Sequence, residues 1–228
     1  MPLSKILSSI GFLALCGLAA PAACGTILYT VSVDTSSQFG NSGYIDLQFN
    51  PGLASQSANV DVEGFITDGT LHPADSLNGA FGDVSGELPG TVSFDNGTSF
   101  NDYTEAITFG DTITFDLFLF GPAIDAPNGE GGGTFTLDFL NADQSAQLFT
   151  ASPTDEPVLT VNINADGTTS GQTYASQGGG PPVVTFSGPA AVPEPSTILL
   201  AGLGIIGLAA FAPRFVTIRM LKTPESKR

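Results

Sequence analysis

Basic residues are nearly absent from this chain of 228 residues, which contains six Lys and Arg but 22 Asp and Glu. Lys5 lies near the N-terminus and the other five lie at or after Arg214, so residues 6–213 contain none. All but two of the acids lie between Asp34 and Asp166. This charge cannot form the positive surface that attracts phosphate backbones or anionic lipids, so we expect no nucleic-acid partner. The carboxylates must instead be solvated, hydrogen-bonded or bound to cations.

Cysteine and histidine are also scarce, which excludes several kinds of active site. Cys16 and Cys24 are the only cysteines and both lie in the N-terminal region, so the rest of the chain has neither a disulfide nor a thiol nucleophile. His72 is the only histidine, and the sequence contains no G-x-S-x-G motif. A Ser-His-Asp apparatus or a zinc site of Cys and His ligands therefore has no support, and we predict no catalytic residues.

Tryptophan is absent, which limits the surfaces that could bind sugars. Sugar rings commonly pack on flat aromatic side chains, and the polar candidates here are Tyr29, Tyr44, Tyr103 and Tyr174, because most of the 17 Phe are expected in the core. Two carboxylates can hydrolyse a glycosidic bond. No spacing singles out such a pair, so a glycan-active enzyme is an alternative without named residues.

Short runs of alternating apolar and polar residues fill the chain between residues 26 and 188. In "TITFDLFLF", residues 112–120, the residues Ile113, Phe115, Leu117 and Leu119 fall on one face, as in a half-buried strand. Comparable runs occupy residues 27–33, 44–49, 59–66, 91–94, 103–109, 133–140, 158–163 and 183–186. We predict an all-β, antiparallel β-sandwich of about nine to eleven strands, with a jelly-roll or immunoglobulin-like order. Residues 189–195 are predicted to be a spacer.

The N-terminal residues 1–25 have the layout of a secretory signal peptide. Lys5 precedes an apolar stretch, and the small residues Ala20 and Ala22 suit cleavage after Ala22. Cleavage after Ala23 or Gly25 fits as well. An uncleaved anchor and an acylated Cys24 are the alternatives.

An apolar segment also lies near the C-terminus. Residues 196–216 are long enough to span a membrane and contain glycines that membrane helices tolerate. The basic tail, residues 217–228, is expected in the cytoplasm by the positive-inside rule, which places the acidic body outside. A buried soluble helix is the alternative.

The order Pro193-Glu194-Pro195, apolar segment and basic residues in "VPEPSTILLAGLGIIGLAAFAPR" resembles the PEP-CTERM sorting signal. The resemblance implies recognition by an exosortase, a membrane-embedded cysteine transpeptidase-like enzyme of Gram-negative bacteria that accompanies exopolysaccharide production. The two prolines suit this role, because they keep the backbone extended and accessible. The dispersed basic residues from Arg214 onward depart from the pattern. The body, for example "TVSVDTSSQFGNSGYIDLQFNPG", is similar to an uncharacterised group of PEP-CTERM exported proteins.

One segment has the spacing of a calcium loop. In "NINADGT", the oxygen-bearing side chains of Asn162, Asn164, Asp166 and Thr168 alternate along the chain, as at the start of D-x-[DN]-x-[DN]-G. Thr173 stands where such a loop has its bidentate acid. Asp166-Gly167 is also a hairpin signal, so a plain turn is the competing interpretation. We expect no cofactor, with Ca²⁺ as the exception that this segment would allow.

These observations predict a noncatalytic protein, exported through the inner membrane to the cell envelope, surface or extracellular matrix of a Gram-negative bacterium. Its expected partners are an exosortase, an exopolysaccharide and, before processing, the membrane through residues 196–216. The alternatives are a glycan-active enzyme with paired carboxylates and a Ca²⁺-dependent adhesion or glycan-binding module.

Overall fold

The computed structural model describes residues 25–73, 79–151 and 156–192. The chain divides into two units, residues 1–192 and 193–228, and all described residues belong to the first. Its strands are β1 (Thr26–Asp34), β2 (Ser42–Asn50), β3 (Asn59–Thr67), β4 (Thr70–Leu71), β5 (Gly79–Phe81), β6 (Val84–Gly86), β7 (Val92–Asp95), β8 (Asp102–Thr108), β9 (Thr112–Phe120), β10 (Gly133–Asn141), β11 (Leu159–Ile163), β12 (Thr169–Thr173) and β13 (Val184–Val192). The described helices are α2 (Pro122–Asp125) and the short 3₁₀ helices Ser36–Gln38 and Gln177–Gly179.

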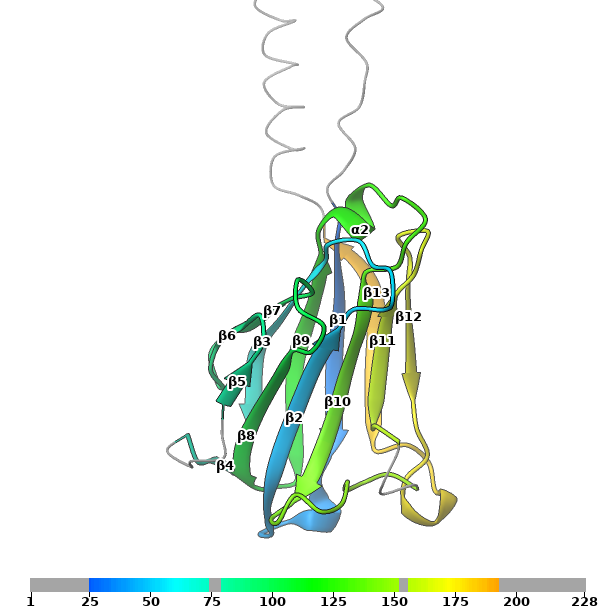
Figure 1. The fold of residues 1–228 in the computed structure, drawn as a ribbon. Coiled ribbons are helices and arrows are strands. Elements are labelled where there is room, and N and C mark those ends of the chain that lie inside the picture. Colours follow the sequence, from blue (N-terminus) through cyan, green and yellow to red (C-terminus); the bar gives the residue numbers. More distant parts are fainter. Residues whose placement is uncertain (1–24, 74–78, 152–155, 193–228) are drawn as a thin grey trace, which may run out of the picture. The chain divides into compact units, whose positions relative to one another are not determined.

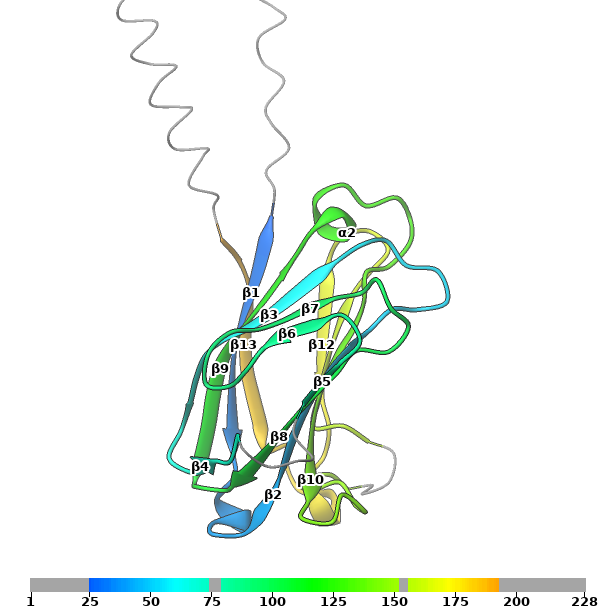
Figure 2. The ribbon, with the colours of Figure 1, turned by 60° about the vertical axis from the view of Figure 1, so that its left-hand side comes forward.

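The strands form two antiparallel sheets that pack face to face (Figures 1 and 2). Sheet A has the order β13-β1-β9-β3-β7-β6, and sheet B has the order β12-β11-β10-β2-β8-β4, with β5 also paired to β8. The first half of the chain pairs with the second half in reverse order, β1 with β9, β2 with β8 and β3 with β7. This nested pairing follows the jelly-roll pattern. Strands β10 to β13 widen the two sheets beside β2 and β1.

The predicted antiparallel sandwich is confirmed, and each of the nine predicted runs overlaps an observed strand. The alternation that predicted β9 holds, because Ile113, Phe115, Leu117 and Leu119 are all buried. The described part has thirteen strands, more than expected. The four that the sequence did not predict, β4, β5, β6 and β12, are short or rich in Gly and Ser, and tertiary pairing rather than apolar alternation makes them strands.

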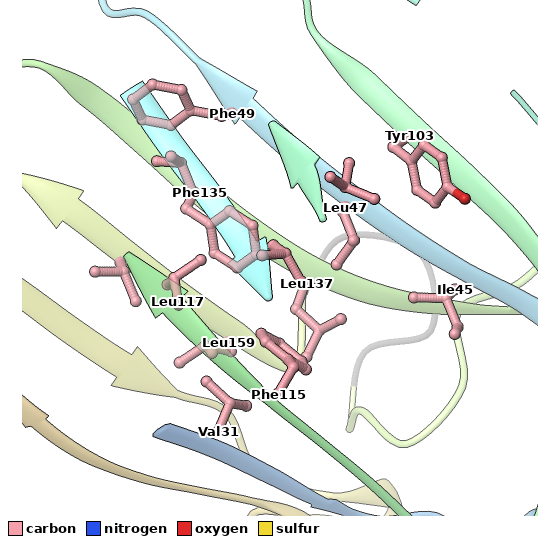
Figure 3. Packing of buried hydrophobic residues seen from close by; sticks show 14 of the residues in the cluster. Val31, Ile45, Leu47, Phe49, Tyr103, Phe115, Leu117, Phe135, Leu137 and Leu159 are labelled. Atoms are coloured by element: carbon pink, nitrogen blue, oxygen red, sulfur yellow. The ribbon is translucent and has the colours of Figure 1, made fainter. Parts of the chain in front are cut away.

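The core fills the space between the two sheets. Figure 3 shows side chains of both sheets meeting there, among them Val31 and Phe115 from sheet A and Leu137 and Leu159 from sheet B. All four side chains are almost completely buried. Burial of apolar surface on this scale is the main force that holds the two sheets together.

The structure moves the end of the sandwich beyond the predicted residue 188. Strand β13 continues to Val192, and Ala190, Ala191 and Val192 pair with Leu28, Ile27 and Thr26 of β1. A bulge at Gly188-Pro189, opposite Tyr29, keeps the strand in the sheet although proline cannot donate a backbone hydrogen bond. Residues 189–192 of the predicted spacer are therefore part of sheet A.

The described residues begin at Gly25, whose backbone N–H donates to Oδ1 of Asp125 at 2.7 Å. The predicted signal peptide up to residue 24, the segment 196–216 and the tail 217–228 lie outside the described residues. Within the described ranges, no helix is long and apolar enough to cross a membrane.

Candidate functional site

Three carboxylates, one at the end of β1 and two in loops, accept hydrogen bonds from nearby residues of the chain, which stabilises their charged form without Lys or Arg partners. Asp34, Asp143 and Asp166 each accept the hydroxyl and the backbone N–H of the Ser or Thr two residues later, with hydroxyl-to-carboxylate distances of 2.5–2.6 Å. These bonds, the hydroxyl first, lower the pKa of all three carboxyl groups. They also shape the loops, because a carboxylate that bonds its own chain stabilises a turn.

The four predicted calcium ligands divide between a strand and a turn. Asn162 lies on β11, where its Oδ1 accepts the hydroxyl of Thr134 at 2.6 Å. Asn164, Asp166 and Thr168 form the β11–β12 turn and bond one another, with Asn164 Nδ2 donating to Thr168 Oγ1 at 3.0 Å. In the described part of the chain, no group of three or more Asp, Glu, His and Cys side chains has an arrangement that could hold a metal ion. The turn interpretation therefore accounts for three of the four residues.

Substituting Asp166 by Ala should lower the melting temperature slightly, because Thr168 loses its hydrogen-bond acceptor. If this segment is only a turn, added Ca²⁺ should shift the melting temperatures of the native chain and of Asp166→Ala by the same amount, through general screening of the negative charge. Calorimetry of both proteins with Ca²⁺ and with Mg²⁺ checks this. A Ca²⁺-specific rise that disappears in Asp166→Ala would contradict it.

A different group of acids lies on the outer face of sheet B, which we name the carboxyl cluster: Asp46 of β2, Asp102 of β8 and Asp138 of β10. Asp46 is the register partner of Asp138, and Asp102 is the partner of Gln48, two residues from Asp46. Neighbouring residues on one face of adjacent strands lie within side-chain reach. Gln48 Nε2 donates to both oxygens of Asp46 at 3.2 Å. The strand pairing therefore brings together three acids that are 36 to 92 residues apart in sequence.

Burial and mutual repulsion change the acidity of the carboxyl cluster. The pKa of Asp46 is raised to about 8, first by burial, then by a hydrogen bond with Asp102 and by the charges of Asp102 and Asp138. Burial alone raises the pKa of Asp138, to about 6. Asp46 therefore keeps its proton at neutral pH. The described residues contain no Lys or Arg, so the proton on Asp46, rather than a basic side chain, reduces the negative charge of the carboxyl cluster.

The cluster brings carboxyl groups close together, but the hydrogen bond between Asp46 and Asp102 places these two nearer than the separation of about 5 to 10 Å that glycoside hydrolysis requires. One oxygen of Asp102 and one of Asp138 are covered from solvent and have no hydrogen-bond partner in the described residues. A hollow of about 260 Å³ beside Thr134 and Asn162 and another of about 350 Å³ beside Tyr44 have none of the three acids in their linings.

The histidine and the tyrosines that the sequence singled out do not form a common site. His72 is exposed, and its Nε2 lies 2.8 Å from the hydroxyl of Thr108. Of the tyrosines expected as sugar platforms, Tyr29, Tyr44 and Tyr103 are buried. Tyr103 donates from its hydroxyl to the buried Glu105 at 2.7 Å and accepts the N–H of Leu88.

The exposed aromatic pair on sheet B is instead formed by two phenylalanines. The rings of Phe81 and Phe100 lie 5.8 Å apart, and both side chains are exposed. Sequence reasoning missed them because it assigned Phe to the core. The signal that could have found them is position, since both stand among turn residues rather than in a long apolar alternation.

Comparison with known families gives a match near the C-terminus of the chain. The model of the PEP-CTERM protein-sorting motif matches residues 191–214, which include Pro193, Glu194 and Pro195. The predicted resemblance is confirmed, and it implies export and processing by an exosortase. Two of the matched residues, Ala191 and Val192, are described and end β13; the rest lie outside the described residues. No curated protein and no solved structure matches the chain.

Proposed function

We propose that this chain is a noncatalytic β-sandwich that an exosortase sorts to the cell surface of a Gram-negative bacterium, where it works in the extracellular polysaccharide matrix. The observation that carries the proposal is the PEP-CTERM protein-sorting motif at residues 191–214. The acidic body, which has no positive surface for nucleic acids or anionic lipids, is consistent with a place outside the cell. The covered carboxyl oxygens of the cluster support a noncatalytic role.

The strand pairing at the two ends of the sandwich suits double processing. Thr26, directly after the predicted signal peptide, is the register partner of Val192, directly before Pro193. Cleavage at both places would leave β1 and β13 complete and paired with each other. The processed protein would therefore keep every described strand of the sandwich.

The test is to measure intact mass and cell fraction of the native chain and of Glu194→Ala in the natural host. Glu225→Ala is the matched control, because Glu225 is the other acid after residue 166 and lies outside the matched stretch. We expect the native chain and Glu225→Ala to lose both terminal segments and leave the inner membrane. Glu194→Ala should keep residues 193–228 and stay membrane-bound.

If all three proteins keep the C-terminal segment in the inner membrane, the segment is a simple anchor and the proposal is wrong. If all three proteins lose both terminal segments, Glu194 is not part of the sequence that the exosortase recognises.

A further inference from the structure

An exposed aromatic pair marks one edge of sheet B. Phe81 is 64% exposed and Phe100 is 45% exposed, and their rings contact each other at 5.8 Å with an interplanar angle of 54°. Most aromatic side chains of the described residues lie in the core, so two adjacent exposed rings are unusual on this surface. Exposed apolar groups that adjoin one another commonly serve binding. Figure 1 shows β5, which ends at Phe81, beside β8.

The backbone beneath this pair is held firmly. Asn101, the residue after Phe100, is completely buried and donates from Nδ2 to the carbonyl of Phe49 at 2.9 Å, while its Oδ1 accepts the N–H of Asp83 at 2.8 Å. Gly82 has a φ of +79°, and a Cβ at this position would collide with the carbonyl of Phe100. The backbone that carries the two rings is therefore fixed, and a ligand would not have to order this part of the chain on binding.

A row of polar side chains continues from the pair across the sheet. Phe81 is the register partner of Asp102, and antiparallel partners point to the same face. From there the successive partners across the sheet define what we name the polar row: Asp102, Gln48, Thr136, Thr160 and Gln172. None of the five is fully buried. With strands about 4.8 Å apart, the distance from β5 to β12 is roughly 24 Å.

The side chains on this face are suited to binding an uncharged polymer that is rich in hydroxyl groups. Amide and hydroxyl groups of the polar row can both donate and accept hydrogen bonds, as sugar hydroxyls require. The carbon–hydrogen faces of sugar rings pack on aromatic rings such as those of Phe81 and Phe100. The only charges on the face are carboxylates, with no Lys or Arg among the described residues, so an anionic polymer is repelled.

We propose that the outer face of sheet B binds a neutral polysaccharide, which stacks on Phe81 and Phe100 and lies along the polar row. This inference deepens the proposed function, since it names the matrix component that the sandwich contacts. It also predicts that binding depends on the length of the glycan, because the aromatic pair and Gln172 lie at opposite edges of the sheet.

The test is affinity electrophoresis of the full chain, purified in a nonionic detergent, through gels that contain hydroxyethylcellulose, dextran or galactomannan, with alginate as the anionic polymer. We expect at least one neutral polymer to retard the native chain and alginate to leave it unretarded. The double variant Phe81→Ala/Phe100→Ala should bind at least tenfold more weakly. Phe39→Ala is the matched control, because Phe39 is 66% exposed and lies in the connection between β1 and β2 rather than on a strand of sheet B. Its loss should change the affinity less than twofold.

A second variant tests the polar row. Gln172→Ala, at the exposed far edge, should weaken binding of the retarding polymer two- to fivefold. It should leave unchanged the affinity for a disaccharide of the same polymer, measured by calorimetry, because a disaccharide covers the aromatic pair alone. Equal melting temperatures of the variants and the native chain exclude unfolding as the cause.

Three outcomes would overturn the inference: retardation by none of the neutral polymers, equal binding by the double variant and Phe39→Ala, or a double variant whose only change is a smaller mass in sedimentation. The last result would make the aromatic pair a contact between copies of this chain. These readouts are independent of sorting, which the fractionation of Glu194→Ala measures, so either proposal can fail without the other.

Discussion

Replacing Asp46 by Asn should stabilise the protein at pH 8 and remove much of its loss of stability above pH 4. The Asp46 carboxyl is partly buried beside Asp102 and Asp138, and its pKa is about 8 in the folded chain, against 3.8 for an ordinary aspartate. An asparagine amide can donate to Asp102 as the protonated acid does, and it cannot ionise. At pH 8 we expect a gain in the free energy of unfolding on the order of 4 kcal/mol.

The sign follows from proton binding. Between about pH 4 and pH 8 the folded chain keeps the Asp46 proton, while the unfolded chain has released it, so stability falls as the pH rises through this window. Asp138, with a pKa of about 6, adds to the loss between about pH 4 and pH 6. Below about pH 4 the lowered pKa values of Asp34, Asp143 and Asp166 act in the opposite sense, because protonation removes their hydrogen bonds to the loops. Stability should therefore be highest near pH 4 to 5.

Urea unfolding at pH 5, 7 and 8, followed by tyrosine fluorescence, measures this dependence. Asp61→Asn is the control, because Asp61 lies on β3 of sheet A, away from the carboxyl cluster. It should keep the native pH dependence. An Asp46→Asn protein that loses stability with pH as steeply as the native chain would show that Asp46 does not hold the proton.

Replacing Phe139 by Ala should cost about 4 kcal/mol of unfolding free energy, since a fully buried ring would leave a cavity. Phe139 packs edge-on against Phe109 and Phe149, with ring centroids 5.9 and 5.3 Å away, and Phe109 contacts Phe149 at 5.6 Å. Phe149 has a φ of +65°, which is unfavourable for a bulky residue, so this triangle of rings also holds a strained backbone in place.

The same urea titration compares Phe139→Ala with Phe139→Leu, which keeps most of the volume and should lose about 1 kcal/mol. The exposed Phe39→Ala should stay within about 0.5 kcal/mol of the native chain. Faster amide exchange at Leu148, whose N–H donates to the carbonyl of Phe139 at 2.6 Å, should accompany the Ala variant. A loss below about 1 kcal/mol for Phe139→Ala would mean that the triangle of rings does not hold this end of the core.

The sequence was sufficient to predict much of the fold. Alternating apolar residues predicted the long strands, because side chains of a strand point to opposite faces and only one face of each sheet is buried. The short strands escaped prediction. Strand β12, with the sequence TSGQT, has no apolar face and forms because β11 offers it backbone partners.

The candidate sites, in contrast to the long strands, could not be predicted from the sequence. Asp46 and Asp138 lie within two of the predicted strands, and Asp102 directly precedes a third, but nothing in the sequence relates the three acids to one another. Only the order β10-β2-β8 makes them neighbours. Phe81 and Phe100 likewise become a pair because β5 joins the edge of β8.

The sequence by itself determined the class of fold, the acidic body without basic residues and the sorting motif, since each depends on residue types and their local order. The tertiary structure decided which acid keeps its proton, which aromatic rings stay exposed and that β13 extends into the first two residues of the sorting motif. The physical reason is that strand pairing joins residues far apart in the chain, and local alternation specifies which face is buried but not which strands are neighbours.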